Sequence, residues 1–246
     1  MYQKIGLKVA TSYSPNFNFP KRSKNRIKFI ILHYTGMKKE SAAIKRLQDP
    51  KSKVSSHYLI KKNGQIINLV PDRYEAWHAG VSSWQNFKFL NKNSIGVEVT
   101  NPGHQHGYIN FSSKQISSLK KLLNFLIKRY KIKKNCILGH SDISPGRKKD
   151  PGEKFPWELL SKNKIGLWHQ ANKDKLNKLR NIKISKNEEI KFLKNLNKIG
   201  YYVKYEAPQK KIKLVKSFQR HFRQKLINGK IDQEMLLIAE KLSKNK

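Results

Sequence analysis

Two short apolar runs that each lead to a histidine constrain the fold of this chain more than any other feature. Residues 26–32 and 136–138 are rich in β-branched and aliphatic side chains, which is typical of short buried strands. His33 follows the first run, and His140 follows the second after one glycine. Because open α/β sheets place ligand sites at the carboxyl ends of their strands, the two histidines could meet at one edge of a sheet.

Two further segments predict strands. Asn63-Gly64 lies between apolar runs at 57–60 and 65–70, and this dipeptide favours the tight turn of a hairpin. Residues 94–100 alternate, so that three aliphatic side chains share one face and Glu98 lies on the other. A carboxylate is therefore expected inside a strand.

Helical segments alternate with these strands. Residues 40–49 have helical composition, and Ser112 with Gln115 fits a capping box at the start of a run whose apolar residues recur at helical spacing up to Tyr130. Strands that alternate with helices predict an α/β layer fold.

The chain beyond the main α/β segment predicts a separate small helical unit. Apolar residues recur there at helical spacing in three segments, and Asn228-Gly229 marks the turn before the third. Between about 158 and 185 the apolar density falls, which indicates a connecting region with one helix around 168–179. We therefore expect an N-terminal extension (1–25), a main domain (26–160), a linker (161–186) and a three-helix domain (187–246).

The charge of the chain is extreme. Lys and Arg number 53 against 16 Asp and Glu, which gives a formal charge of +37 and would ordinarily suggest nucleic acid or an anionic surface as a partner. Arg, the preferred reader of phosphates and bases, occurs at only nine positions, however, so the excess is almost entirely lysine. We therefore expect no specific nucleic-acid partner, and we read most of the lysines as compositional bias.

Cysteine usage and the N-terminus set further bounds. Cys136 is the single cysteine, so no intramolecular disulfide or cysteine-based zinc knuckle can form, and we expect an inert buried thiol. The first 26 residues show no apolar core or cleavage pattern of a signal peptide, and nowhere do eighteen apolar residues run together. Any metal site must use His, Asp or Glu.

One such site can be assembled from the strand ends. Asp150 stands ten residues after His140, in a loop whose Pro145 and Gly146 can turn the chain back. Two histidines and one carboxylate would give Zn²⁺ three ligands and leave a fourth position for water, as in catalytic zinc sites. The alternative is that each histidine is a packed or hydrogen-bonded residue at the end of its strand.

Five segments of the chain stand out as ordered motifs. They are Phe-Ile-Ile-Leu-His33-Tyr-Thr, Ser56-His57-Tyr58-Leu-Ile, Ala76-Trp77-His78-Ala-Gly80, Ser94-Ile-Gly-Val-Glu98-Val and Gly139-His140-Ser-Asp142-Ile-Ser-Pro145-Gly146-Arg147-Lys148-Lys-Asp150-Pro-Gly. In this order they resemble the zinc-dependent N-acetylmuramoyl-L-alanine amidases of the amidase-2 family, which share their fold with peptidoglycan recognition proteins. The resemblance spans about residues 26–160 and implies a central mixed β-sheet flanked by helices.

The resemblance implies a role for each polar residue of the motifs. His33, His140 and Asp150 would be the zinc ligands, Glu98 the general base and Lys148 the partner of the developing oxyanion. The implied reaction is hydrolysis of the amide between N-acetylmuramoyl, or anhydro-N-acetylmuramoyl, residues and L-alanine, in cell-wall turnover or recycling. The alternative is a non-catalytic peptidoglycan recognition protein, but relatives of that kind lack part of the ligand set.

Other residues of the motifs have weaker assignments. The resemblance implies that His57, Trp77 and His78 line the groove for sugar and stem peptide, whereas the alternative makes them core or hydrogen-bonded strand residues. Tyr34 and Thr35 follow the first ligand and are expected near the substrate.

Four polar residues in or near the motifs can each be interpreted in two ways. Asp142 could orient His140 or cap its turn, and His104 and His106 could form a rim or be ordinary loop residues. Lys149 competes with Lys148 for the role beside the oxyanion; family register favours Lys148, and we expect Lys149 to be solvated.

The C-terminal unit resembles the three-helix peptidoglycan-binding domain of wall hydrolases, through Val215-Lys-Ser-Phe218-Gln219-Arg220-His221-Phe222 and Asn228-Gly229-Lys-Ile231-Asp232. The alternative is a bundle that only packs on the main domain. We expect a monomer that binds peptidoglycan or muropeptides and makes electrostatic contact with an anionic wall or membrane surface. A wall-binding domain favours the periplasm or cell envelope, whereas the missing signal peptide leaves the cytoplasm open.

Overall fold

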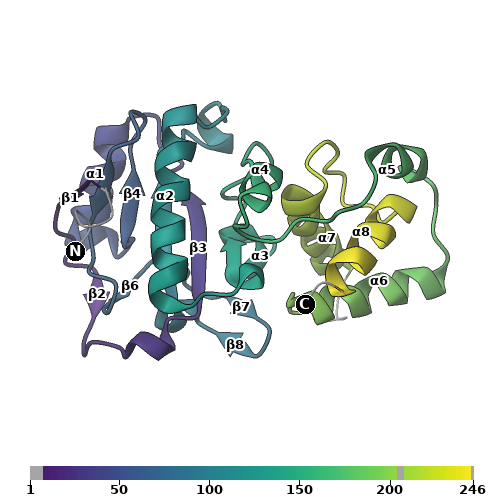
Figure 1. The fold of residues 1–246 in the computed structure, drawn as a ribbon, viewed down its shortest axis with the longest axis horizontal. Coiled ribbons are helices and arrows are strands. Elements are labelled where there is room, and N and C mark those ends of the chain that lie inside the picture. The colour runs from purple at the N-terminus through teal and green to yellow at the C-terminus, as the bar shows by residue number, and fades with distance from the viewer. Residues whose placement is uncertain (1–7, 204–207, 245–246) are drawn as a thin grey trace.

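The central element of the fold is a six-stranded mixed sheet. A computed structural model describes residues 8–203 and 208–244 (Figure 1). All neighbouring strands are parallel except β5 and β4, which form the hairpin predicted around Asn63-Gly64. The strand order across the sheet is β1 (Val9–Thr11), β5 (Ile66–Asn68), β4 (Tyr58–Ile60), β9 (Ser94–Val99), β3 (Phe29–Tyr34) and β10 (Ile137–Gly139).

Helices cover the sheet as the periodicity predicts. Figure 1 shows α2 (Ser113–Tyr130) lying over one face of the sheet, beside β3. Most of the apolar side chains of this helix are buried. Ser112 and Gln115 form the predicted capping box, which satisfies the first free N–H groups of this helix. The remaining elements of the main part are α1 (Glu40–Gln48), α3 (His140–Ile143), α4 (Trp157–Lys162) and two small sheets, β2 (Phe17–Asn18) with β6 (Glu75–Ala76) and β7 (Ser83–Trp84) with β8 (Phe87–Lys88).

The C-terminal helices gather at one end of the molecule, beyond α3 and α4 (Figure 1). They are α5 (Lys173–Leu179), α6 (Lys186–Ile199), α7 (Pro208–Phe222) and α8 (Gln233–Lys244). Buried apolar side chains of these helices belong to the same continuous core cluster as those of the sheet and α2. The α/β class, the flanked mixed sheet and the three C-terminal helices are therefore confirmed.

The structure differs from the predicted elements at three places. Strand β3 continues through His33 to Tyr34, because its pairing with β9 extends to Val99. Residues 9–11, which we assigned to an extension, add an edge strand beside β5. The linker helix begins at Lys173 rather than near 168, because the Asn172 side chain caps it by accepting the Lys175 N–H.

No helix in the part of the chain that the structure describes has the length and apolar character needed to span a membrane.

Candidate metal centre

The topology of the sheet brings the two strand-end histidines together. Strands β3 and β10 are parallel neighbours, with Leu32 opposite Gly139, so their carboxyl ends lie at the same edge. His33 is the residue after Leu32, and His140 is the first residue of α3, directly after Gly139. The convergence expected from the sequence therefore occurs.

Asp150 completes a cluster of three buried ligand atoms. Its Oδ2 lies 2.9 Å from Nδ1 of His33 and 3.0 Å from Nδ1 of His140, and the two Nδ1 atoms are 3.0 Å apart. One donor atom from each residue thus points at a common centre, and the three are the only such group of His, Cys, Asp or Glu in the described residues. Two imidazole nitrogens and one carboxylate oxygen form a donor set that suits Zn²⁺.

The protonation states of these residues favour a cation. Burial, with the charge of His140 as a second cause, lowers the pKa of His33 to about 4. Burial alone would raise the pKa of Asp150, but the two histidines outweigh it and hold the pKa far below its usual range. At neutral pH His33 thus offers a lone pair and Asp150 a negative charge, as metal binding requires.

The far nitrogen of each histidine is held by a hydrogen bond. With Nδ1 of His33 facing the cluster, Nε2 donates to Nδ1 of His78 at 3.1 Å, and His78 in turn donates to Ser94 Oγ at 3.2 Å. Nε2 of His140 donates to the carbonyl of Ala79 at 3.0 Å. A Cβ at Gly96 would lie 2.5 Å from Cγ of the His78 ring, so only glycine leaves room for it there. Such bonds fix the orientation of ligand histidines.

Removing the end of this relay should weaken metal binding. We expect Ser94→Ala to lower zinc affinity about 10- to 100-fold, because His78 loses its acceptor and no longer fixes the His33 ring. Competition with a chelator of known affinity measures this. Ser52→Ala is the matched control, because it also removes one serine hydroxyl, but that hydroxyl donates to the carbonyl of Arg46 in α1 and takes no part in the relay. Wild-type zinc affinity in Ser94→Ala would contradict the role of the relay.

Glu98 stands directly beside this centre. It occupies β9 opposite His33 in the parallel register, and it lines the same cleft. Its Oε2 atom is buried and has no hydrogen-bond partner among the described residues. Burial, reinforced by the negative charge of Asp150, raises the pKa of Glu98 to about 8, while Lys148 opposes the shift. A carboxyl group with one unpartnered oxygen and a pKa close to neutral pH is suited to take up and release a proton during a reaction.

The cluster forms the floor of a cleft of about 620 Å³. Of the predicted substrate-binding residues, the structure places Tyr34, Thr35, Trp77 and His78 in its lining. The lining also includes the metal-ligand candidates, Glu98, Lys148 and the following residues: Lys149, Arg46, Arg147, His104, Gln105 and His106.

His57 lies elsewhere. It is fully buried, is not among the residues that line the cleft, and is fixed by the Gly96 N–H on Nδ1 and by Arg22 and the Tyr74 carbonyl at Nε2. These contacts give no support to substrate binding by His57 and match the hydrogen-bonded strand residue of the alternative reading.

Two residues at the cleft, Arg147 and His104, make contacts that the sequence does not predict. Arg147 donates to the carbonyls of Ala79 and Val81 at 2.6 and 2.8 Å and so braces the segment whose carbonyl holds His140. On the rim, His104 lies 2.9 Å from the Tyr34 hydroxyl and 3.0 Å from Glu153. Glu153 stood outside every motif, and only the fold brings it to His104.

Comparisons with known proteins show which family the chain is similar to. Residues 23–153 match the N-acetylmuramoyl-L-alanine amidase family. Escherichia coli AmiD, an N-acetylmuramoyl-L-alanine amidase, is 37% identical over 88% of this chain and 82% of its own length. Haemophilus influenzae AmpD, a 1,6-anhydro-N-acetylmuramyl-L-alanine amidase, is 45% identical over 43% of this chain and 56% of its own length.

Solved structures extend the similarity to the whole fold. The complex of E. coli AmiD with the substrate anhydro-N-acetylmuramic acid-L-Ala-D-gamma-Glu-L-Lys superposes with a TM-score of 0.79 at 34% identity, covering 93% of both chains. Pseudomonas aeruginosa AmpDh3 in complex with anhydromuramic pentapeptide gives 0.79 at 28% identity, covering 94% of this chain and 96% of the other. The similarity to both therefore includes the C-terminal helices.

Proposed function

The chain belongs to the N-acetylmuramoyl-L-alanine amidase family and is an enzyme of that class, and on this premise we propose that it works with a zinc ion held by His33, His140 and Asp150. The bond it cleaves is the amide between a muramoyl residue and L-alanine. The observation that carries the proposal is the set of three buried donor atoms within 3.0 Å of one another, with Glu98 at the same edge of the sheet. The complete donor set supports an enzyme over a recognition protein without catalysis.

The residues of the cleft have distinct roles in this reaction. A zinc ion in the site would polarise the amide carbonyl and lower the pKa of the attacking water toward about 7. Glu98 accepts the proton of that water and delivers it to the leaving amine of L-alanine. The ammonium group of Lys148 stabilises the negative charge that develops on the carbonyl oxygen. Trp77, Tyr34 and Thr35 line the cleft beside these groups and are positioned to contact sugar and stem peptide.

The substrate is a muropeptide or the same unit in peptidoglycan, as the complexes of the two relatives suggest. To distinguish these two substrates, intact sacculi and soluble anhydro-muropeptides are supplied in parallel assays. The released stem peptide is measured by chromatography. Zinc content is measured on the same sample. A zinc-loaded protein that releases stem peptide from neither substrate would contradict the proposed function.

Lys148 and Lys149 provide a matched pair of variants. Lys148 is among the charges that act on Glu98 and His33, whereas Lys149 is not, so Lys148 is the better candidate for the oxyanion. We expect Lys148→Met to lower kcat about 10²- to 10³-fold, the usual cost of losing one oxyanion partner. Lys149→Met should change kcat less than about threefold, since a solvated lysine contributes little to an adjacent site. Steady-state kinetics on a soluble muropeptide measures both, and the opposite order would reassign the role.

The C-terminal helices and the lysine-rich surface complete the proposal. We assign residues 187–246 to a peptidoglycan-binding-like domain on the sequence resemblance described above, and we expect the exposed lysines to favour anionic wall polymers.

A further inference from the structure

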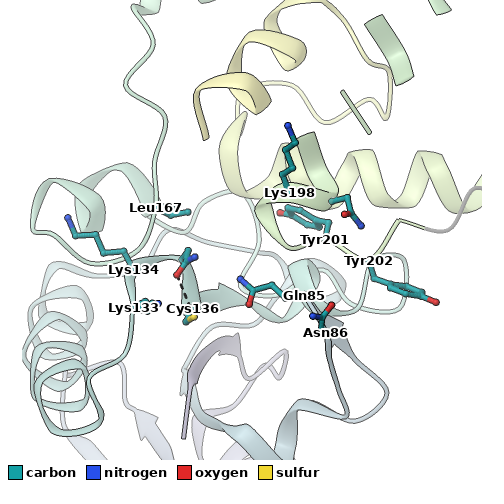
Figure 2. A pocket seen from close by; sticks show the side chains of 11 residues that line it. Gln85, Asn86, Lys133, Lys134, Cys136, Leu167, Lys198, Tyr201 and Tyr202 are labelled. Atoms are coloured by element: carbon teal, nitrogen blue, oxygen red, sulfur yellow. Dashed lines mark hydrogen bonds between the residues drawn. The ribbon is translucent and has the colours of Figure 1, made fainter. Parts of the chain in front are cut away.

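The interface between the main part and the C-terminal helices, here called the seam, contains an open crevice beside Tyr201 and a closed, tightly packed part around Asp142. A crevice of about 840 Å³ opens between the β7–β8 turn, residues 133–136 and the end of α6 (Figure 2). Figure 2 shows the ammonium groups of Lys134 and Lys198 pointing to different sides, not toward one point, so the crevice does not form a convergent anion site. Tyr201 forms part of its wall, and the hydroxyl of Tyr201 reaches the closed part of the seam.

The closed part centres on the carboxylate of Asp142, two residues after the ligand His140. Asp142 is 1% exposed. Its Oδ1 accepts the Tyr201 hydroxyl at 2.6 Å, and its Oδ2 accepts Nδ1–H of His221 at 2.7 Å and the backbone N–H of Gly139 at 2.7 Å. Two of these three donors belong to the C-terminal part. Asp142 therefore does not orient the ring of His140, which bonds to the carbonyl of Ala79. Instead, its carboxylate joins α3 to α7 and to Tyr201, which follows α6.

A second connection runs to Asp150 itself. The Ser217 hydroxyl, on α7, donates to the carbonyl of Ser141, and the N–H of Ser141 donates to the carbonyl of Asp150 at 2.8 Å. Ser217 is fully buried, so water does not compete for this bond. Helix α7 thus contacts the backbone directly after His140 and, through Ser141, the backbone of Asp150.

The side chain of His221 is held in place for its contact. Its ring stacks on Trp157 with centroids 3.8 Å apart and an interplanar angle of 17°, and on Phe222 at 3.9 Å and 8°. Trp157 begins α4, which follows the loop that carries Asp150. The donors that reach Asp142 are therefore parts of a packed core, and they cannot swing away as exposed side chains would.

We propose that the C-terminal part is a structural part of the metal centre: Tyr201, His221 and Ser217 are positioning residues that hold the segment from His140 to Asp150, which begins with α3, in its ligating geometry. The inference rests on the proposed function, in that it takes these residues to be the zinc ligands. It differs from a wall-binding module on a flexible tether, because such a module could be undocked without any effect on the metal.

The test uses the full chain with small substitutions at the seam. Tyr201→Phe and Ser217→Ala each delete one hydroxyl and leave the packing in place. We expect the double variant to bind zinc at least about tenfold more weakly in chelator competition, which is the usual cost of losing partners behind metal ligands. With Co²⁺ in place of zinc, the visible absorption spectrum should also shift, because it reports the ligand geometry.

Two controls separate positioning from general stability. Tyr130→Phe removes a hydroxyl that donates to the carboxylate of buried Asp72 at 2.6 Å, in the main part but away from the ligand loop. It should lower the Tm as Tyr201→Phe does, yet change zinc affinity less than about twofold. At position 221, His221→Asn keeps a donor near Nδ1 and should retain zinc affinity within about threefold, whereas His221→Leu should lose at least tenfold.

The outcomes distinguish the two proposals. Suppose that the wild type binds zinc and cleaves muropeptide, and that the double variant binds zinc as tightly with an unchanged Co²⁺ spectrum. This result would overturn the positioning role and leave the proposed function intact. A wild type that binds no zinc would overturn both. If the double variant does not fold, Tyr201→Phe alone is measured against Tyr130→Phe, and equal zinc affinities would overturn the inference.

Discussion

Glu98→Gln should lower kcat about 10²- to 10⁴-fold, the range that a positioned general base contributes. Gln keeps the size of the side chain but cannot take up a proton from water or pass one to the leaving amine. The Oε2 atom of Glu98 has no competing partner among the described residues, so the loss is assigned to the proton transfer and not to a broken hydrogen bond. Stem-peptide release from a soluble muropeptide, with zinc content measured on each preparation, tests the prediction.

The stability of the same variant provides its control. The pKa of Glu98 is raised to about 8 in the folded protein, so the folded state binds this proton more tightly than the unfolded chain does. The metal-free wild type should therefore lose stability as pH rises from about 4.5 to about 8, and Gln should abolish that contribution. Metal-free Glu98→Gln should thus have a Tm at pH 8 at least equal to that of the wild type. An inactive variant with a clearly lower Tm would instead indicate disrupted folding, and turnover like that of the wild type would contradict the mechanism.

Asp150→Asn should weaken zinc binding by more than the roughly 100-fold that loss of a supporting partner can cost, because it removes a ligand itself. Oδ2 of Asp150 contacts Nδ1 of both His33 and His140, the other proposed ligands, and it supplies the negative charge of the buried donor set. An amide there retains the shape but leaves the cation without its charged partner in a buried site. Activity at micromolar zinc should disappear with the metal.

The control and the reverse experiment use the same assay. Asp174→Asn changes an exposed carboxylate on α5 and should affect neither zinc content nor activity. Treating the wild type with a chelator should abolish turnover, and adding zinc back should restore it. A chelated protein that keeps its full activity would exclude zinc as the cofactor.

Local signals in the sequence were sufficient for the elements that carry the chemistry. The apolar runs before His33 and His140 predicted neighbouring strand ends, since buried parallel strands are nearly continuous in apolar residues. The alternation around Glu98 predicted a carboxylate inside a strand, and Ser112 with Gln115 predicted where the long helix begins. Each of these signals depends on side chains only a few residues apart.

Other features depend on contacts between distant segments and had no local signal. The carbonyl of Ala79 that holds His140 is a backbone atom, which any residue type could supply. Asp142 had two local readings, and neither included Tyr201 and His221, which lie 59 and 79 residues away along the chain. Residues 9–11 are too short to indicate a strand by themselves, and they form one where β5 offers an edge.

The register of β3 against β9 makes catalysis a reporter of correct folding. His33 lies opposite Glu98 in the register of the parallel β3–β9 pair, so the hydrogen bonds of the ladder fix their relative position before any metal or substrate binds. A slip of one residue would place Val97 or Val99 opposite His33 and would turn Glu98 to the other face of the sheet. Such a molecule could still be compact and could still hold a cation, but it would lack a proton acceptor at the cleft. With Glu98 as the proposed general base and zinc as the proposed metal, the turnover rate per bound zinc ion should therefore follow the fraction of molecules whose strands are in register.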